Sequence, residues 1–197
     1  MENYYKTLPE GYREVKVVDA KKGSTSALFT VSSIVLTILA LVPIVLNCDY
    51  SKVSLNFHDR QTLIAYFLMF VVLIVYIILH ELTHGIAYKA LTHQKLTYGF
   101  TLTVAFCGVP DIYTSRKTAL IALAAPFVTF TVILIPLVVW LHSVSMLYYL
   151  VFGFIFASHF GGCIGDLYMM YLLFFKYKDP RTLMNDTGPK QTIYIPE

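Results

Sequence analysis

Charged residues are scarce in this chain. They make up 14% of its 197 residues, and hydrophobic residues make up 57%, whereas soluble domains contain roughly 25% and about 45–50%. This composition excludes an ordinary soluble domain and indicates a membrane protein. The length is that of a single domain.

Cysteine is also rare. Cys48, Cys107 and Cys163 are odd in number and far apart, and they include no Cys-x-x-Cys pair. The sequence therefore provides neither a disulfide framework nor a cysteine zinc site. Residues 1–24 are polar and carry both charges, unlike a signal peptide, so we expect the first apolar segment to be retained as an anchor.

Long apolar runs are abundant instead. Four of them are long enough to cross the roughly 30 Å hydrocarbon core of a bilayer. We expect transmembrane helices over residues 25–46, 61–91, 118–141 and 144–175. The predicted fold is an all-α integral membrane protein with four transmembrane helices and a short β-hairpin or re-entrant segment between helices two and three. Its predicted parts are an N-terminal arm (1–24), a membrane-embedded domain (25–177) and a poorly ordered tail (178–197).

The connection between the second and third helices has the pattern of a strand. From Leu96 to Phe106 large apolar residues alternate with small or hydroxyl residues, and a turn is expected at residues 107–111. Strict alternation predicts a β-strand. Such a strand can offer its edge to an extended peptide. The alternative is a hairpin that only packs over helix ends, and the sequence favours neither.

Positive charges are distributed unequally among the loops. Of the 15 Lys and Arg residues, all except Lys52 and Arg60 lie in the arm, in the connection between helices two and three, or in the tail. Because cytoplasmic loops are enriched in Lys and Arg, we expect both termini to be cytoplasmic. The expected location is a bacterial plasma membrane.

The predicted spans contain two carboxylates, Glu81 and Asp166. An acid inside a membrane costs about 2.5–3.5 kcal/mol on insertion scales, so it usually marks a functional site. Glu81 lies in the motif HELTH, in which one helical face presents His80 and His84 to a single Zn²⁺. Glu81 is then the general base for a zinc-activated water. The alternatives are a hydrogen-bonded histidine pair or a salt-bridged acid without metal.

A catalytic zinc needs a third protein ligand. The residues of HELTH lie about 19–23 positions into the second helix from the outer surface, and Asp166 lies about 20–22 positions into the fourth. At ~1.5 Å per residue both reach a depth of roughly 30 Å, which favours Asp166. His159, seven residues earlier, and Cys163 remain as alternatives that either contribute to the metal site or pack in the core.

These residues resemble those of the site-2-protease type of intramembrane zinc metalloprotease. HELTHG matches the zinc-binding helix of that family, Ala-Leu-Ala-Ala-Pro-Phe at residues 122–127 is similar to its Gly-Pro segment, and Gly165-Asp166 corresponds to the aspartate that provides its third ligand. With Leu-Pro-Glu-Gly-Tyr at residues 8–12, the chain also resembles small bacterial membrane proteins of the zincin peptidase group. The resemblance implies His80, His84 and Asp166 as zinc ligands.

The sequence departs from the larger family around the substrate. The usual Leu-Asp-Gly is replaced by Gly-Asp-Leu at residues 165–167, and Gly-Pro-x-x-Asn by Ala-Pro-Phe-Val-Thr at residues 125–129. A side-chain amide is therefore missing or replaced by a hydroxyl. The resemblance implies the metal ligands and the base, but not the mode of substrate recognition.

We therefore expect a membrane-embedded zinc metalloprotease that hydrolyses peptide bonds in or near the bilayer. The expected partners are a membrane protein or peptide substrate and the lipid bilayer, with no nucleic acid. The alternative function is that of a pseudoprotease, a non-catalytic zinc-binding membrane protein that binds or regulates a membrane partner. The sequence predicts no oligomeric state.

Overall fold

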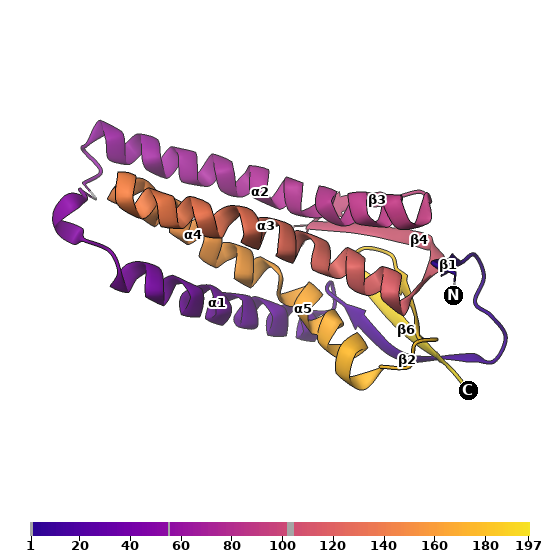
Figure 1. The fold of residues 1–197 in the computed structure, drawn as a ribbon. Coiled ribbons are helices and arrows are strands. Elements are labelled where there is room, and N and C mark those ends of the chain that lie inside the picture. Colours follow the sequence, from indigo (N-terminus) through magenta and orange to yellow (C-terminus); the bar gives the residue numbers. More distant parts are fainter. Residues whose placement is uncertain (1, 55, 102–104) are drawn as a thin grey trace. The chain divides into compact units, whose positions relative to one another are not determined.

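The computed structural model describes residues 2–54, 56–101 and 105–197. Within these residues the chain is about 62% helical and also forms a six-stranded antiparallel sheet (Figure 1). The helices are α1 (Gly23–Leu46), α2 (Arg60–Thr92), α3 (Arg116–Val144), α4 (Met146–Gly162) and α5 (Ile164–Tyr171), with a short 3₁₀ helix η1 (Tyr50–Lys52) and a short π-helix η2 (Leu172–Lys176). The strands are β1 (Tyr4–Tyr5), β2 (Tyr12–Asp19), β3 (Thr97–Phe100), β4 (Ala105–Ser115), β5 (Leu183–Asp186) and β6 (Lys190–Pro196).

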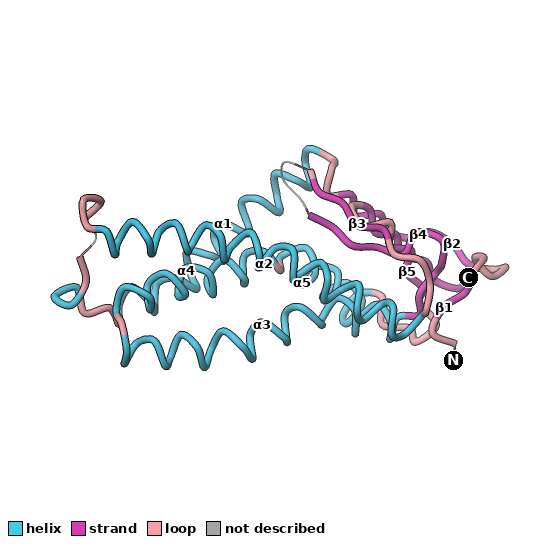
Figure 2. The backbone as a smooth tube through the Cα atoms, turned by 90° about the horizontal axis from the view of Figure 1, so that it is seen from above, coloured by secondary structure: helices cyan, strands magenta, loops and turns pink. Residues whose placement is uncertain are grey.

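The sheet shows that the prediction of an all-α fold with a short hairpin is wrong. Its strand order is β1-β4-β5-β6-β2. β3 pairs with β4, and these two strands lie side by side in Figure 2. The N-terminal arm contributes β1 and β2, and the tail, which was expected to be poorly ordered, contributes β5 and β6. The sequence pattern missed this because partners lie far apart in the chain, with Tyr12 opposite Pro196.

The predicted strand in the second connection is confirmed only in part. Residues 97–100 form β3, but residues 107–111, expected as a turn, belong to β4. Residues 102–104 of the predicted strand lie outside the described residues. In the register of the two strands Tyr98 is opposite Cys107 and Gly99 is opposite Phe106. Because side chains alternate along a strand, the side chain of Tyr98 lies on the opposite face of β3 from Gly99.

The chain forms two compact units, each with its own core. The sheet unit comprises residues 1–30, 78–126 and 165–197, and the helical unit comprises residues 31–77 and 127–164. In the sheet unit, strand residues such as Met184 and Ile193 pack with Met169 and Leu173 in one fully buried cluster. This cluster attaches the tail strands to the segment that carries Asp166.

The helical unit is an apolar bundle formed by parts of α1, α2, α3 and α4. Buried residues such as Phe130, Leu134 and Ile155 fill one of its clusters. Gly161 allows a close helix approach, because a Cβ there would overlap the side chain of Thr37 and lie 2.7 Å from the carbonyl oxygen of Ser33. Small residues commonly permit such contacts between apolar helices.

Four helical segments of the described chain are long and apolar enough to cross a membrane. They are Gly23–Leu46, Arg60–Thr92, Arg116–Val144 and Met146–Lys176. The fourth predicted span is not one regular helix, because α4 ends at Gly162 and α5 begins at Ile164 after a turn at Cys163. This break places Asp166 in the first turn of a new helix.

Candidate metal centre

The two histidines of HELTH lie next to each other on α2. Because they are four residues apart, both imidazoles project from the same helical face. Their ring centroids are 5.0 Å apart with the planes at 75°, and each residue is only 6% exposed. Two imidazoles are thus held close together at a buried position on one face of α2. A metal site there needs a further ligand from another segment.

Asp166 is that partner. Its Oδ2 lies 3.3 Å from Nε2 of His80, and its Oδ1 lies 3.3 Å from Nε2 of His84. Ligand atoms of the three residues can be chosen that all lie within 4.8 Å of one another. Around a tetrahedral zinc with bonds of about 2.0–2.1 Å, neighbouring ligand atoms are roughly 3.3–3.4 Å apart. The separations and the donor types therefore fit Zn²⁺.

The orientation of His84 is fixed by a backbone carbonyl of α3. Its Nδ1 lies 2.8 Å from the carbonyl oxygen of Ala122, and a carbonyl can only accept, so Nδ1 carries the proton. Ala122 is four residues before Pro126, and proline has no N–H to donate to that carbonyl within the helix. Pro126 thus leaves the Ala122 carbonyl available to His84. This explains in physical terms why proline follows the Ala-Leu-Ala-Ala run.

The tautomer of His84 has a consequence for the centre of the site. With its proton on Nδ1, neutral His84 presents the lone pair of Nε2 to Oδ1 of Asp166 at 3.3 Å. Two acceptors that face each other repel unless a proton or a metal cation lies between them. The arrangement therefore fits one of two states. Either a zinc ion lies between the acceptors, or the histidine is protonated and forms an ion pair with the carboxylate.

Glu81 lies beside this site on α2. The next turn of α2, which contains Gly85, is covered by β3 of the sheet. It follows His80 directly and is half-buried. One turn further along α2, a Cβ at Gly85 would overlap the hydroxyl of Tyr98 and lie 3.2 Å from a methyl group of Leu96. The glycine of HELTHG thus provides the space in which β3 lies against α2.

Asp186, a buried carboxylate in β5, was not predicted from the sequence. Its Oδ2 accepts from the Tyr88 hydroxyl at 2.7 Å and from Gln191 at 3.1 Å, and its Oδ1 accepts from the backbone N–H of Gly188 at 2.8 Å. Burial raises the pKa of Asp186 to about 6, although these three hydrogen bonds oppose the shift. Tyr88 lies one turn after His84, so the tail is attached to the helix that carries the motif.

The two alternative ligands, His159 and Cys163, lie together in the helical unit. Nδ1 of His159 lies 2.8 Å from the Tyr76 hydroxyl and 3.6 Å from the Cys163 sulfur, and Nε2 lies 3.0 Å from the Thr131 hydroxyl. Both ring nitrogens of this fully buried histidine therefore have hydrogen-bonding neighbours. The arrangement favours the interpretation of His159 as a histidine that links helices.

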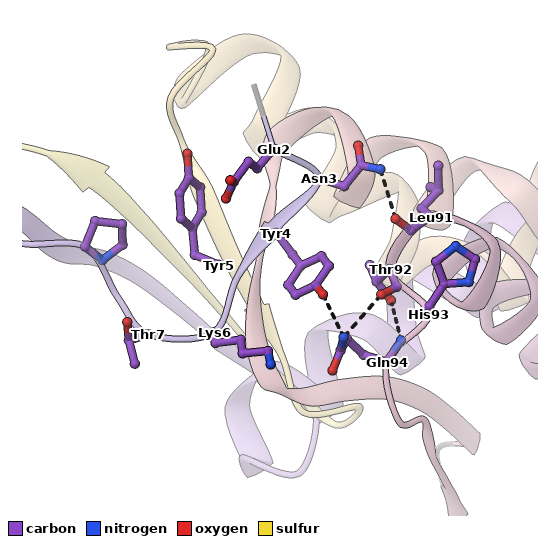
Figure 3. A pocket seen from close by; sticks show the side chains of 11 residues that line it. Glu2, Asn3, Tyr4, Tyr5, Lys6, Thr7, Leu91, Thr92, His93 and Gln94 are labelled. Atoms are coloured by element: carbon purple, nitrogen blue, oxygen red, sulfur yellow. Dashed lines mark hydrogen bonds between the residues drawn. The ribbon is translucent and has the colours of Figure 1, made fainter.

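A pocket of about 700 Å³ lies elsewhere in the sheet unit, between the N-terminal residues and the end of α2 (Figure 3). Asn3 donates to the carbonyl of Leu91 at 2.9 Å, and Gln94 donates to the Tyr4 hydroxyl at 2.7 Å. None of the predicted site residues lines this pocket. Its contacts satisfy the end of α2 and do not form part of the metal centre.

Comparison with known proteins identifies the family of this chain. Residues 73–180 match the model of a family described as "Putative zincin peptidase". Because the match covers more than half of the chain and includes HELTHG and Asp166, the chain belongs to that family. The description fits a metalloprotease in general, and zincin implies zinc. No curated protein and no solved structure matches the chain.

Proposed function

We propose that this chain is a zinc metallopeptidase that hydrolyses peptide bonds within or beside a lipid bilayer. His80, His84 and Asp166 hold the zinc, and Glu81 is the general base. The observation that carries the proposal is the convergence of both Nε2 atoms on the Asp166 carboxylate at 3.3 Å. Three protein ligands are the usual number at a catalytic zinc, which keeps one position open.

Each group at the proposed site has a separate role in the hydrolysis. When bound, zinc acts as a Lewis acid that polarises a carbonyl and lowers the pKa of water towards ~7. The Glu81 carboxylate takes a proton from the attacking water as its oxygen bonds to the scissile carbonyl carbon. Glu81 then delivers that proton to the nitrogen as the C–N bond breaks. Ala122 keeps the His84 ring in the tautomer that can ligate.

Location in a membrane accounts for the surface of the helices. Large apolar side chains such as Leu28, Ile38 and Leu46 on α1 are exposed, and such a surface is stable in lipid. All Lys and Arg residues except Lys52 and Arg60 belong to the sheet unit, as do both termini (Figure 1). This distribution supports a cytoplasmic sheet unit and cytoplasmic termini.

The substrate of the proposed reaction is a membrane protein or peptide in extended form. A helical peptide hides its carbonyls in its own hydrogen bonds, so it must unwind before it can be hydrolysed. In the described part of the chain β3 pairs with β4 alone, and it lies against α2 at Gly85. We propose that the other edge of β3 binds the substrate as an added strand.

The test compares the wild-type protein with Glu81→Gln in two measurements. Purified protein in detergent should contain about one zinc per chain in both forms, since Glu81 is not a ligand. Membrane proteomes should contain peptide fragments that appear with the wild type and are lost with Glu81→Gln, because removal of a general base typically costs 10²–10⁴-fold in rate. Glu14→Gln, an exposed carboxylate on β2, is the matched control.

The outcomes separate the alternatives. Zinc in the wild type without any fragments that depend on Glu81 would identify the non-catalytic zinc-binding protein. Fragments that are unchanged in Glu81→Gln would remove Glu81 from its proposed role. A wild-type chain without zinc would exclude the metallopeptidase altogether.

A further inference from the structure

Tyr98 places a phenol next to the helix that carries Glu81. Its hydroxyl occupies the space that a side chain at Gly85 would need. Residues 81 and 85 are four apart, so they share one face of α2. A side chain on a helix leans towards the N-terminus, and the volume left empty at Gly85 therefore opens towards the turn of Glu81. The phenol lies on the Glu81 face, one turn from the proposed base.

The environment of Tyr98 keeps its proton available. Burial raises the pKa of the phenol, and the Cys107 thiol and the Glu81 charge raise it further, so the group stays neutral and remains a donor. Its cross-strand neighbour Cys107 is a hydrogen-bond partner. Burial raises the pKa of this thiol to about 12, and a neutral thiol is only a weak acceptor. A peptide carbonyl would compete successfully for the phenol proton.

Tyr98 is also accessible to a substrate. The residue is 46% exposed, unlike the buried histidines, and it lies on β3, the strand whose edge is proposed to bind the peptide. A substrate strand beside β3 would pass the hydroxyl on its way to the zinc ligands. Negative charge that develops on the scissile carbonyl oxygen requires donors that are already in place.

We propose that Tyr98 is a further catalytic residue: its hydroxyl donates a hydrogen bond to the carbonyl oxygen of the scissile peptide bond as that oxygen gains negative charge. The inference rests on the proposed peptidase function. It assigns to the sheet, through β3, a direct part in the chemistry. The leaving proton is still handled by Glu81, and Tyr98 keeps its own proton throughout.

The test is Tyr98→Phe, which removes one hydroxyl and retains the ring. With a cleavable peptide, kcat should fall roughly 10²–10³-fold, the usual cost of losing one such donor, while KM and zinc content stay the same. The affinity for a phosphinic peptide, a tetrahedral analogue of the transition state, should weaken by a similar factor. Tyr113→Phe, a tyrosine of β4 whose ring packs on Tyr194, should change none of these quantities.

A second measurement does not depend on the fold tolerating phenylalanine. Fluorinated tyrosine at position 98 lowers the phenol pKa without changing the shape, and it should move the alkaline limb of the kcat–pH profile to lower pH. Unchanged kcat and phosphinic-peptide affinity in Tyr98→Phe, with Glu81→Gln inactive, would overturn the role of Tyr98 alone. Wild-type turnover in Glu81→Gln would instead overturn the proposed function.

Discussion

At the scale of single residues, Asp166 is the carboxylate that faces both histidines of HELTH. Each of its oxygens faces one imidazole at 3.3 Å, and its position in the first turn of α5 stabilises a negative charge through the helix dipole. No other carboxylate joins both histidines in a candidate metal group of the described residues.

Replacement of Asp166 by alanine should therefore empty the metal site. Losing a second-sphere partner weakens metal binding roughly 10–100-fold, and losing a ligand should cost more than that. The zinc content of purified Asp166→Ala should fall well below the wild-type value, and activity should fall with it. Asp179→Ala, which removes a partly exposed carboxylate paired with Arg181, should retain zinc. Full occupancy in Asp166→Ala would show that another residue is the third ligand.

Asp186 should make the stability of the fold depend on pH. Burial raises its pKa from 3.8 to about 6 in the folded protein, so the folded state binds more protons than the unfolded state between these values. The free energy of unfolding should therefore be highest below about pH 4, decrease by about 3 kcal/mol as the pH rises to 6, and then level off.

Asp186→Asn, which is neutral at every pH, should lack this decrease. Asparagine can still accept a hydrogen bond from the Tyr88 hydroxyl, so the hairpin of β5 and β6 should remain attached to α2. Denaturant unfolding in detergent at several pH values between 3.5 and 7.5 measures the difference between the two proteins. Asp111→Asn, on the exposed face of β4, is the control. A wild-type slope that persists in Asp186→Asn would assign the effect to another group.

Part of the candidate site could be predicted from the sequence, and the rest could not. The spacing of His80, Glu81 and His84 defines one helical face without any knowledge of the fold, and Asp166 followed from its depth in an apolar helix. Tyr98 and Asp186 could not be found in that way. Their roles depend on the return of β3 and of the tail onto α2, which is set by tertiary packing and has no local signal.

At the scale of elements, α3 shows how a backbone irregularity can serve a side chain. Pro126 and Pro136 both lie inside this helix, which runs without a break from Arg116 to Val144. The consequence of Pro126 is local, since it leaves the Ala122 carbonyl free to orient His84.

Pro126→Ala should weaken zinc binding while making the helix itself more regular. Alanine restores an N–H that competes with His84 for the Ala122 carbonyl, and the histidine then loses its fixed tautomer. The expected weakening of zinc affinity is roughly 10–100-fold, measured by competition with a chelator. Pro136→Ala on the same helix is the matched control and should bind zinc normally. Equal affinities in the two variants would contradict this role of Pro126.

The sheet shows why the strands were harder to predict from the sequence than the HELTH motif. Residues 190–196 contain the β-prone run Thr-Ile-Tyr-Ile, yet they follow Gly188 and Pro189 in a polar tail that was expected to be poorly ordered. Their pairing with β2, at the other end of the chain, buries Val18 and Ile193 in a common cluster. Neither segment has enough apolar residues to be stable alone, so only the pairing makes both of them strands.

At the scale of the whole molecule, the distribution of charge corresponds to the two units. The sheet unit holds all Lys and Arg residues other than Lys52 and Arg60. Translocation of so many cations across a membrane is unfavourable, so the orientation of the chain should be determined by the sheet unit as a body. The loop between α1 and α2, which contains Cys48, should then lie on the opposite side.

Cysteine labelling in intact cells tests this orientation. In a background with Cys107 and Cys163 replaced by alanine, Cys48 should react with a membrane-impermeant maleimide added outside. A second protein, in which Cys48 is also replaced and Lys178 in the tail is changed to cysteine, should react only after the membrane is permeabilised. The reverse pattern would place the sheet unit, and with it the zinc ligands and Tyr98, near the outer surface. In that case the substrates would be extracytoplasmic, while the chemistry assigned to His80, His84 and Asp166 would be unaffected.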